Sequence, residues 1–368
     1  MMMTFLIAVG SLVAICGILA LLLVIADRYL NDYGICKLII NKGSREEDVE
    51  GGSTLLNSLN SAGVFIPSAC GGQGSCGLCK LKVHSGAPPV LPTEEPHLSP
   101  EEVSEHVRLC CQLKVHEDME LEIPEELFNI REFEGTVESL TDLNHDIKRL
   151  RVALPEGEEL DIIPGQYVQI ETPAYKKTPE PVYRAYSIAT DPHDKTHIDL
   201  VIRLVPGGIC TTFVFEHMEP GQPIKLNGPY GDFRLTDTEK EMIFIAGGSG
   251  MAPFLSMLAH MRNENIQRKV TYFFGARAKR DLICLDEMKA FEEALPNFKF
   301  VPCLSEPMPD DNWDGDTGLV TDVMKQHCPD LSNMEAYLCG SPGMCDASVV
   351  ALTGNGMPEE NIFFDKFS

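Results

Sequence analysis

The sequence predicts a multidomain protein of the α+β and α/β classes with a single transmembrane helix near its N-terminus. One observation is an uncharged stretch over residues 5–26, and another is a cysteine-rich loop at residues 70–79 that precedes a strand. The third is a change of pattern, from short alternating strands after Pro124 to apolar strands that alternate with helices from Met242 onward. The expected parts are a transmembrane helix at 5–26 and domains at 33–125, 130–236 and 237–368.

The composition limits the possible functions. With 368 residues, 44% hydrophobic and 23% charged, the chain suits two or three globular domains. A net charge of −25 argues against nucleic-acid binding, because neutralising phosphates requires a basic surface. The thirteen cysteines are an odd number without framework-like spacing, so we expect reduced thiols in a cytosolic compartment rather than disulfides.

The uncharged stretch from Phe5 to Ala26 has 22 residues, about 33 Å as a helix, which matches the core of a bilayer. A signal peptide is disfavoured because no basic residue precedes the stretch and its end is a poor cleavage site. Basic residues follow only after it, so the domains should lie on the cytoplasmic side. These basic residues are Arg28, Lys37, Lys42 and Arg45.

The loop Cys70-Gly-Gly-Gln-Gly-Ser-Cys76-Gly-Leu-Cys79 predicts a metal centre, since thiolates are the ligands that iron–sulfur clusters and zinc select. Either Cys110 or Cys111 supplies the fourth thiol. The spacing is one residue longer than the plant-type pattern for a [2Fe–2S] cluster. A second C-x-x-C pair, which zinc ribbons use, is missing, so structural zinc is the weaker alternative.

The segment around this loop resembles plant- and adrenodoxin-type ferredoxins. A strand at 35–41, a helix at 54–63, the loop and a strand at 80–84 follow one another in the same order. This resemblance implies a β-grasp domain. The stretch Arg108–Leu113 resembles the ferredoxin pattern R-L-x-C-Q, which makes Cys111 the fourth ligand and turns Cys110 to the other side of a strand. The implied [2Fe–2S] ligands are Cys70, Cys76, Cys79 and Cys111.

The middle of the chain predicts an antiparallel β-barrel with a phosphate site. Short strands are expected at 133–140, 148–153, 167–171 and 198–204. Arg184-Ala-Tyr186-Ser187 places a cation, a ring and a hydroxyl on one further strand. Pro206–Thr212 offers free amides and hydroxyls that suit a phosphate. Alone, either motif is also explained by an ordinary barrel strand or turn.

Together with the stretches at 164–167 and 228–233, these motifs resemble the ferredoxin–NADP reductase superfamily. By that resemblance Arg184 holds the pyrophosphate of FAD, because bidentate donors fit phosphate. Tyr186 stacks on the flavin ring and Ser187 lies near its reactive N5. The residues implied to cap the pyrophosphate are Gly208, Thr211 and Thr212.

The last third predicts a parallel sheet that binds a nucleotide. An apolar strand at 242–246 leads into a glycine turn and then a helix, and the amides at such a helix start face phosphates. Strands at 270–274 and 336–339 should bring their carboxyl ends to the same edge. The candidate cofactor-binding residues here are Gly247, Gly248, Gly250, Pro253 and Arg277.

In the superfamily, the stretch that begins at Cys339 lies beside the nicotinamide, which implies that Cys339 helps to place the hydride donor. The alternative is an ordinary buried thiol. Arg277, Lys279 and Arg280 could bind the 2′-phosphate of NADPH, but nearby acidic residues weaken their field. An ordinary solvated basic turn explains these residues equally well, and we favour NADH mainly through the family resemblance described next.

The whole chain resembles the F-subunit family of the sodium-translocating NADH:quinone oxidoreductases. The signs include the motifs at 68–72, 91–94, 118–126 and 311–313. In that family a terminal aromatic residue covers the flavin, which points to Phe367 in the tail. The implied catalytic set is thus Cys339, Ser187 and Phe367. Between Pro173 and Pro181 this chain is shorter than the family pattern, which puts partner docking in doubt.

The resemblance implies an NADH dehydrogenase subunit, single-pass in the inner membrane of a bacterium. Electrons would pass from NADH to FAD, to the [2Fe–2S] cluster and to membrane partner subunits, which reach quinone and export sodium. One rival is the reductase component of a multicomponent oxygenase, which usually lacks an anchor. The other is a non-catalytic membrane tether that binds zinc.

Overall fold

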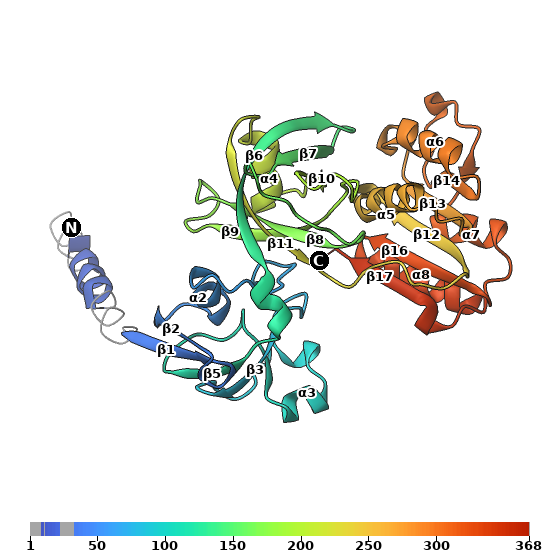
Figure 1. Ribbon diagram of the computed structural model, residues 1–368. Helices are drawn as coiled ribbons and strands as arrows, with labels where there is room; N and C mark the ends of the chain where they lie inside the picture. The colour runs from blue at the N-terminus through green and yellow to red at the C-terminus, as the bar shows by residue number, and fades with distance from the viewer. Residues whose placement is uncertain (1–8, 11, 23–32, 368) are drawn as a thin grey trace. The chain divides into compact units, whose positions relative to one another are not determined.

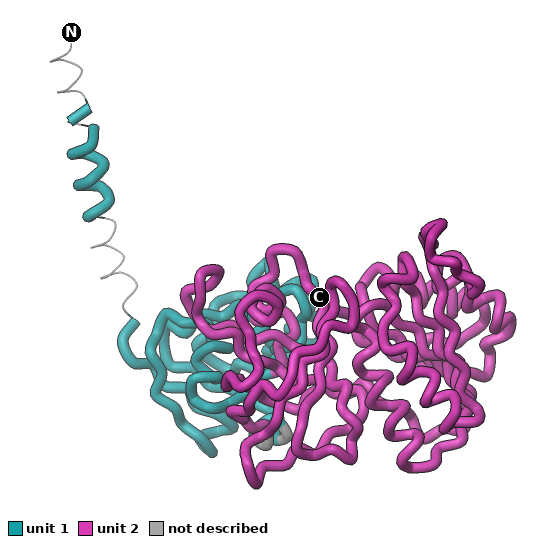
Figure 2. Tube along the Cα trace, turned by 90° about the horizontal axis from the view of Figure 1, so that it is seen from above, with its two compact units in different colours: residues 1–66, 72–129 teal, residues 67–71, 130–368 magenta. Residues whose placement is uncertain are grey.

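The computed structural model describes residues 9–10, 12–22 and 33–367 (Figure 1). The chain divides into two compact units, residues 1–66 with 72–129 and residues 67–71 with 130–368 (Figure 2). Residues 9–10 and 12–22 are helical. Within the described residues, no helix combines the length and the hydropathy that crossing a bilayer requires. The span predicted at 5–26 includes residues 5–8, 11 and 23–26, which lie outside the described residues.

The first unit contains a mixed five-stranded sheet in the order β2-β1-β5-β3-β4. β1 is parallel to β5, and the other neighbours are antiparallel. The helix predicted at 54–63 is confirmed: the Thr54 side chain accepts a hydrogen bond from the Asn57 amide and begins the helix. The elements are β1 (Ile35–Ile40), β2 (Arg45–Glu50), α2 (Leu55–Ser61), β3 (Lys80–Ser85), α3 (Pro100–Ser104), β4 (Val107–Leu109) and β5 (Met119–Glu122).

The predicted antiparallel barrel is confirmed, with strands that lie between residues 131 and 230. Its six strands lie in the order β10-β7-β6-β11-β8-β9. A bridge between Ile188 and Leu200 joins the two end strands, so the sheet closes on itself. The elements are β6 (Arg131–Asp142), β7 (Ile147–Ala153), β8 (Tyr167–Thr172), β9 (Val182–Ser187), β10 (His197–Arg203), α4 (Ile209–Glu216) and β11 (Pro223–Tyr230).

The predicted parallel sheet is confirmed as well, with the order β15-β14-β13-β12-β16-β17. Alternate residues of β12 enter two cores: Phe244 packs with α5 and α6, and Ile245 packs with α7 and α8. The strands are β12 (Glu241–Gly247), β13 (Val270–Ala276), β14 (Phe298–Leu304), β15 (Asp316–Thr317), β16 (Met334–Gly340) and β17 (Ile362–Lys366). The helices are α5 (Ala252–Asn263), α6 (Leu285–Ala294), α7 (Val320–His327) and α8 (Pro342–Gly354).

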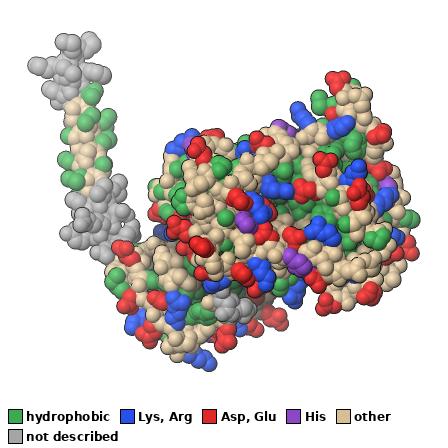
Figure 3. All heavy atoms as spheres, turned by 45° about the horizontal axis from the view of Figure 1, so that its top comes forward, with side chains coloured by type: hydrophobic (Ala, Val, Ile, Leu, Met, Phe, Trp, Pro, Cys, Tyr) green, Lys and Arg blue, Asp and Glu red, His purple; other side chains and the backbone are tan. Residues whose placement is uncertain are grey.

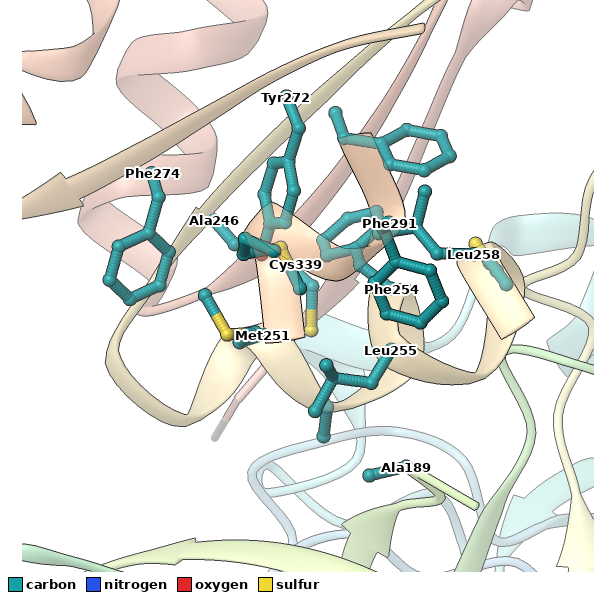
Figure 4. Packing of buried hydrophobic residues seen from close by; sticks show 14 of the residues in the cluster. Ala189, Ala246, Met251, Phe254, Leu255, Leu258, Tyr272, Phe274, Phe291 and Cys339 are labelled. Atoms are coloured by element: carbon teal, nitrogen blue, oxygen red, sulfur yellow. The ribbon is translucent and has the colours of Figure 1, made fainter. Parts of the chain in front are cut away.

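The barrel and the parallel sheet share one hydrophobic core within the second unit. Ile147, Ala189 and Val201 of the barrel pack in the same cluster as Phe254 of α5 and Cys339 of β16. Figure 4 shows Cys339 among the residues of this cluster. Because the cluster spans both sheets, strand ends from the two domains meet inside one compact unit.

Candidate functional site

The predicted cluster ligands of the first unit include buried thiols that lie close together. The amide of Cys110 donates to the carbonyl of Cys79 at 2.9 Å. The side chains of Cys110 and Cys111 both interact with the Cys79 thiol, whose pKa the first raises and the second lowers. Cys70 is buried in the segment 67–71 of the second unit, and Cys76 is partly buried.

The expected strand geometry at Cys110 and Cys111 is wrong. β4 ends at Leu109, and the amide of Gln112 donates to the Leu109 carbonyl at 2.9 Å, so both cysteines lie in a turn. Residues in a turn do not alternate between two faces, and both thiols are buried near Cys79. The choice of Cys111 over Cys110 therefore rests on the sequence resemblance.

Gln112 connects this turn to the glycine loop. Its Nε2 donates to Sγ of Cys111 at 3.3 Å. Gly74 has a φ of +74°, and a Cβ atom at this position would lie 2.7 Å from the same amide nitrogen. Only glycine therefore lets the loop pass this close to Gln112.

Glu94 also stabilises the turn that carries Cys110 and Cys111, through the Leu109 amide just before it. Its carboxylate is fully buried and accepts from the Leu109 amide at 2.9 Å and the Leu91 amide at 3.0 Å. It also pairs with the guanidinium of Arg108, which donates further to two proline carbonyls. Burial alone would raise the pKa of Glu94, but these hydrogen bonds and the arginine charge lower it below its usual range.

The thiols and the loop supply the chemistry of an iron–sulfur site. A [2Fe–2S] cluster is bound by four thiolates divided between two irons. Buried thiols beside a loop of positive-φ glycines supply the ligand chemistry and the close backbone approach that such a cluster needs.

On the barrel, β9 carries the predicted flavin residues. Arg184 donates to the carbonyl of Tyr183 at 2.8 Å, and no carboxylate among the described residues lies within 4.0 Å of its guanidinium. Burial raises the pKa of Tyr186 well above its usual value, and the Cys210 thiol of α4 adds to this effect. The Tyr186 hydroxyl therefore stays protonated beside Cys210 of α4. Arg184 on the same strand is a cation without a carboxylate partner among the described residues.

The start of α4 is built by the glycine turn predicted at 206–212. Gly208 precedes the helix, and a Cβ there would lie 2.6 Å from Oγ1 of Thr211. That hydroxyl accepts from the Val205 amide at 3.1 Å. Oγ1 of Thr212 accepts from Nζ of Lys177 at 2.7 Å. The turn therefore places the first amides of α4, which a helix leaves without intrahelical partners, beside two hydroxyls that are hydrogen-bonded within the protein.

In the parallel sheet, Gly247 ends β12 and a 3₁₀ turn over Gly248–Met251 leads into α5. A side chain at Gly250 would collide with the carbonyl of Cys339, so only glycine lets this turn pass so close to β16. Pro253 sits in the first turn of α5, where no amide partner is needed. The helix start thus offers its amides to a phosphate at the carboxyl edge of the sheet.

Arg277 at the end of β13 is exposed and ion-paired. Its guanidinium lies 3.3 Å from a carboxylate oxygen of Glu306, and the Glu306 amide donates to the Arg277 carbonyl at 2.7 Å. The two side chains are 73% and 66% exposed, so the pair itself is weak. Glu306 therefore offsets part of the charge of Arg277 at this edge of the sheet.

The predicted residues Ser187 and Cys339 meet at the junction of the barrel and the sheet, together with Asp365. The Ser187 hydroxyl donates to Oδ2 of Asp365 at 3.0 Å and also interacts with the Cys339 thiol. Burial raises the pKa of Cys339 well above its usual value, with the Asp365 charge adding to the effect. Burial likewise raises the pKa of Asp365, against the hydrogen bond from Ser187. The thiol is therefore neutral at pH 7 and does not act as a thiolate.

Sequence reasoning missed Asp365. It is the acidic residue of the terminal aromatic stretch, and its register partner across the β16–β17 pair is Cys339. Phe367, the predicted aromatic cover, follows β17: its amide donates to the Gly340 carbonyl at 2.9 Å, and its ring packs at the edge of the shared core. The signal that could have found Asp365 was a carboxylate placed opposite a strand-end cysteine in a parallel pair.

Three domain families match the chain in sequence order. They are the 2Fe-2S iron-sulfur cluster binding domain over residues 38–116, the oxidoreductase FAD-binding domain over 134–235 and the oxidoreductase NAD-binding domain over 244–349. The chain therefore holds a [2Fe–2S] cluster, FAD and NADH, and it relays electrons from NADH through FAD to the cluster.

Relatives that match nearly the whole chain support this assignment. The F subunit of the Na(+)-translocating NADH-quinone reductase of Neisseria meningitidis serogroup C / serotype 2a is 37% identical, covering 95% of this chain and 96% of the relative. The protein of the same name from Actinobacillus succinogenes is 37% identical, covering 99% and 98%.

Solved structures share the architecture. The Amycolatopsis cytochrome P450 reductase GcoB is similar with a TM-score of 0.71 and 30% identity, covering 90% of this chain and 98% of that one. The ferredoxin reductase in carbazole 1,9a-dioxygenase gives a TM-score of 0.69 and 25% identity, covering 91% and 99%. Taken with the ordered set of domains and the relatives above, the chain is an oxidoreductase that belongs to the F-subunit family of the Na(+)-translocating NADH-quinone reductases.

Proposed function

We propose that this chain is the membrane-anchored, electron-input subunit of a sodium-translocating NADH:quinone oxidoreductase. The observation that carries the proposal is the 37% identity to relatives of that name over 95% to 99% of the chain. By their name, those relatives reduce quinone and translocate sodium as one subunit of a larger assembly. The electrons that leave this chain would likewise pass through such an assembly to quinone.

Ser187, Cys339 and Asp365 form what we call the flavin junction. There Ser187 orients the reactive edge of the flavin ring, and Asp365 fixes the Ser187 hydroxyl through the 3.0 Å hydrogen bond. Cys339, a neutral buried thiol, limits how closely the nicotinamide approaches. Phe367 covers the face where the nicotinamide docks. FAD supplies the chemistry between donors and acceptors, because it takes two electrons together and releases them singly.

The remaining assigned residues bind cofactors. Arg184 holds the pyrophosphate of FAD and Tyr186 stacks on its ring, with Gly208, Thr211 and Thr212 at the start of α4. Gly247, Gly248, Gly250 and Pro253 form the dinucleotide turn, and Arg277 borders it. Buried thiols and the glycine loop support the cluster ligands Cys70, Cys76, Cys79 and Cys111.

We further propose that residues 5–26 form one transmembrane helix with the domains on the cytoplasmic side, in the inner membrane of a bacterium. The 22 uncharged residues and the basic residues after them support this assignment. The domains are 33–125 for the cluster, 130–236 for FAD and 237–368 for NADH. Partner subunits in the membrane take electrons from the cluster and pass them toward quinone.

The rival function is the reductase component of an oxygenase, favoured by the similarity to two oxygenase-system reductases over 90% and 91% of the chain. Both functions share the path from NADH to the cluster and differ only in the acceptor. The acceptor is therefore what the experiment must identify.

The test is to purify the full chain from detergent-solubilised membranes of its own cell and to identify the proteins that accompany it. NADH oxidation is then measured with quinone, with and without sodium, and with an artificial acceptor. The matched control lacks residues 1–32. We expect it to keep activity toward the artificial acceptor and to lose membrane association and quinone reduction.

A full chain that purifies alone and drives a hydroxylase, without sodium-dependent quinone reduction, would establish the oxygenase reductase instead. A colourless protein that contains zinc but no iron, acid-labile sulfide or flavin would establish the non-catalytic tether. Copurifying membrane subunits with sodium-stimulated quinone reduction support the proposed function.

A further inference from the structure

The connection between β8 and β9, residues 173–181, contains a tight two-residue turn. The backbones of Tyr175 and Thr178 exchange two hydrogen bonds of 2.9 Å, so Lys176 and Lys177 are its central residues. Neighbouring residues at a turn tip point in different directions. The turn therefore presents two adjacent cations to different surroundings.

Tyr175 anchors this turn on α4. Its hydroxyl donates to the carbonyl of Ile209, the first residue of the helix. Its ring packs edge-on against Phe213 and His217, each with a centroid distance of 5.5 Å. The turn is thus fixed against the same helix whose start forms the proposed flavin phosphate site.

The two lysines have different partners. Lys176 is ion-paired with Glu216 near the end of α4, at 3.4 Å between two largely exposed side chains. Lys177 instead donates to the buried hydroxyl of Thr212 at 2.7 Å, in the first turn of α4. Among the described residues, no carboxylate lies within 4.0 Å of Nζ of Lys177.

Within the part of the chain that the structure describes, Lys177 and Arg184 are cations without a carboxylate partner in a strongly acidic protein. The chain has 55 acidic and 30 basic residues, and on the face in Figure 3 acidic and basic side chains are interspersed. Lys177 and Arg184 are both left with only hydroxyl or carbonyl partners among the described residues. The charge of Arg184 also acts on Cys210 in the first turn of α4, where it opposes the rise in thiol pKa that burial causes. Lys177 thus contacts the first turn of α4 directly, and the charge of Arg184 acts on a second residue of that turn, at the positive end of the helix.

We propose that Lys177 binds the pyrophosphate of FAD, so that the short β8–β9 turn is part of the flavin site. The proposal rests on the proposed function, since it places the pyrophosphate at the start of α4. A pyrophosphate carries negative charge on two phosphates, and Arg184 alone supplies one positive charge. Lys177 provides the second, held in place by Thr212 and by the anchor at Tyr175.

The test compares Lys177→Met with Lys176→Met in the full chain, two substitutions at adjacent positions of the same turn. Dissociation constants for FAD and for riboflavin, which carries no phosphate, are measured by flavin fluorescence titration of the flavin-stripped protein. We expect Lys177→Met to weaken FAD binding about tenfold to a hundredfold, the usual effect of losing one charge-assisted hydrogen bond. Lys176→Met should bind FAD like the parent, Lys177→Arg should restore binding, and riboflavin binding should be unchanged in all.

Equal FAD affinity in Lys177→Met and Lys176→Met would overturn the assignment of Lys177. If Lys177→Met weakens riboflavin as much as FAD, the residue only maintains the fold and the assignment also fails. Arg184→Leu tests the proposed flavin site as a whole. If Arg184→Leu loses FAD and Lys177→Met does not, the flavin site stands without Lys177. If both variants keep FAD, the proposed flavin site itself is wrong.

Discussion

Replacing Glu94 with Gln tests whether a buried ion pair holds the turn that carries Cys110 and Cys111. Glu94 is fully buried and its partner Arg108 is 7% exposed, so solvent screens the pair very little. Glutamine keeps the shape but removes the charge, which leaves the buried guanidinium without a counter-ion. Removing one partner of such a pair costs about 3 to 5 kcal/mol. Against a domain stability of about 5 to 15 kcal/mol, that is a large loss.

The assay is amide hydrogen exchange of the full chain, read by mass spectrometry on peptides that contain Leu109. The Leu109 amide donates directly to Glu94, so its exchange reports the opening of this turn. A loss of about 3 kcal/mol corresponds to exchange about two powers of ten faster. Glu105→Gln is the matched control, because its exposed pair with Lys82 should contribute about 1 kcal/mol or less.

The pH dependence has a definite sign. The pKa of Glu94 is lower in the folded protein than its usual unfolded value of about 4.3, so its contribution is fully present above that pH. It is lost as the pH falls through the folded-state pKa. Exchange at Leu109 that is no faster in Glu94→Gln than in Glu105→Gln would refute the reasoning, as would protection that persists unchanged into strong acid.

Three other predictions concern the redox path. Cys111→Ala should remove the visible and paramagnetic signals of the cluster while NADH still reduces FAD; loss in Cys110→Ala alone would reverse the ligand choice. Gln112→Leu removes the hydrogen bond to Cys111 and should lower the cluster potential by about 40 mV, equivalent to about 1 kcal/mol, in a potentiometric titration; an unchanged potential contradicts this role. Asp365→Asn should slow flavin reduction by NADH about tenfold and shift its pH profile, without changing FAD content; a parental stopped-flow rate and profile would exclude a positioning role.

The order of domains could be predicted because each depends on local pattern. The apolar run at 242–246 and the glycines after it require only neighbours in sequence to form a strand, a turn and a helix start. The loop at 70–79 likewise indicates thiolate chemistry by composition alone. Local pattern thus indicated the thiolate loop and the phosphate sites, whereas FAD and NADH as the cofactors came from the family resemblance.

Residues that meet through tertiary contacts were harder to predict. Ser187 and Asp365 are 178 positions apart, and nothing in the local sequence pairs them. The strand expected to continue through Cys110 and Cys111 ends at Leu109, because the Gln112 amide folds back to the Leu109 carbonyl. The short segment at 173–181 was expected to bear only on partner docking, yet the structure packs it on α4 through Tyr175. In each case a long-range contact decided the outcome.

The hydrogen bond between Ser187 and Asp365 also has a consequence for synthesis. During translation the strand that carries Ser187 is made well before β17, which is the last element of the chain. A chain that ends before residue 362 lacks Asp365 and cannot form this hydrogen bond.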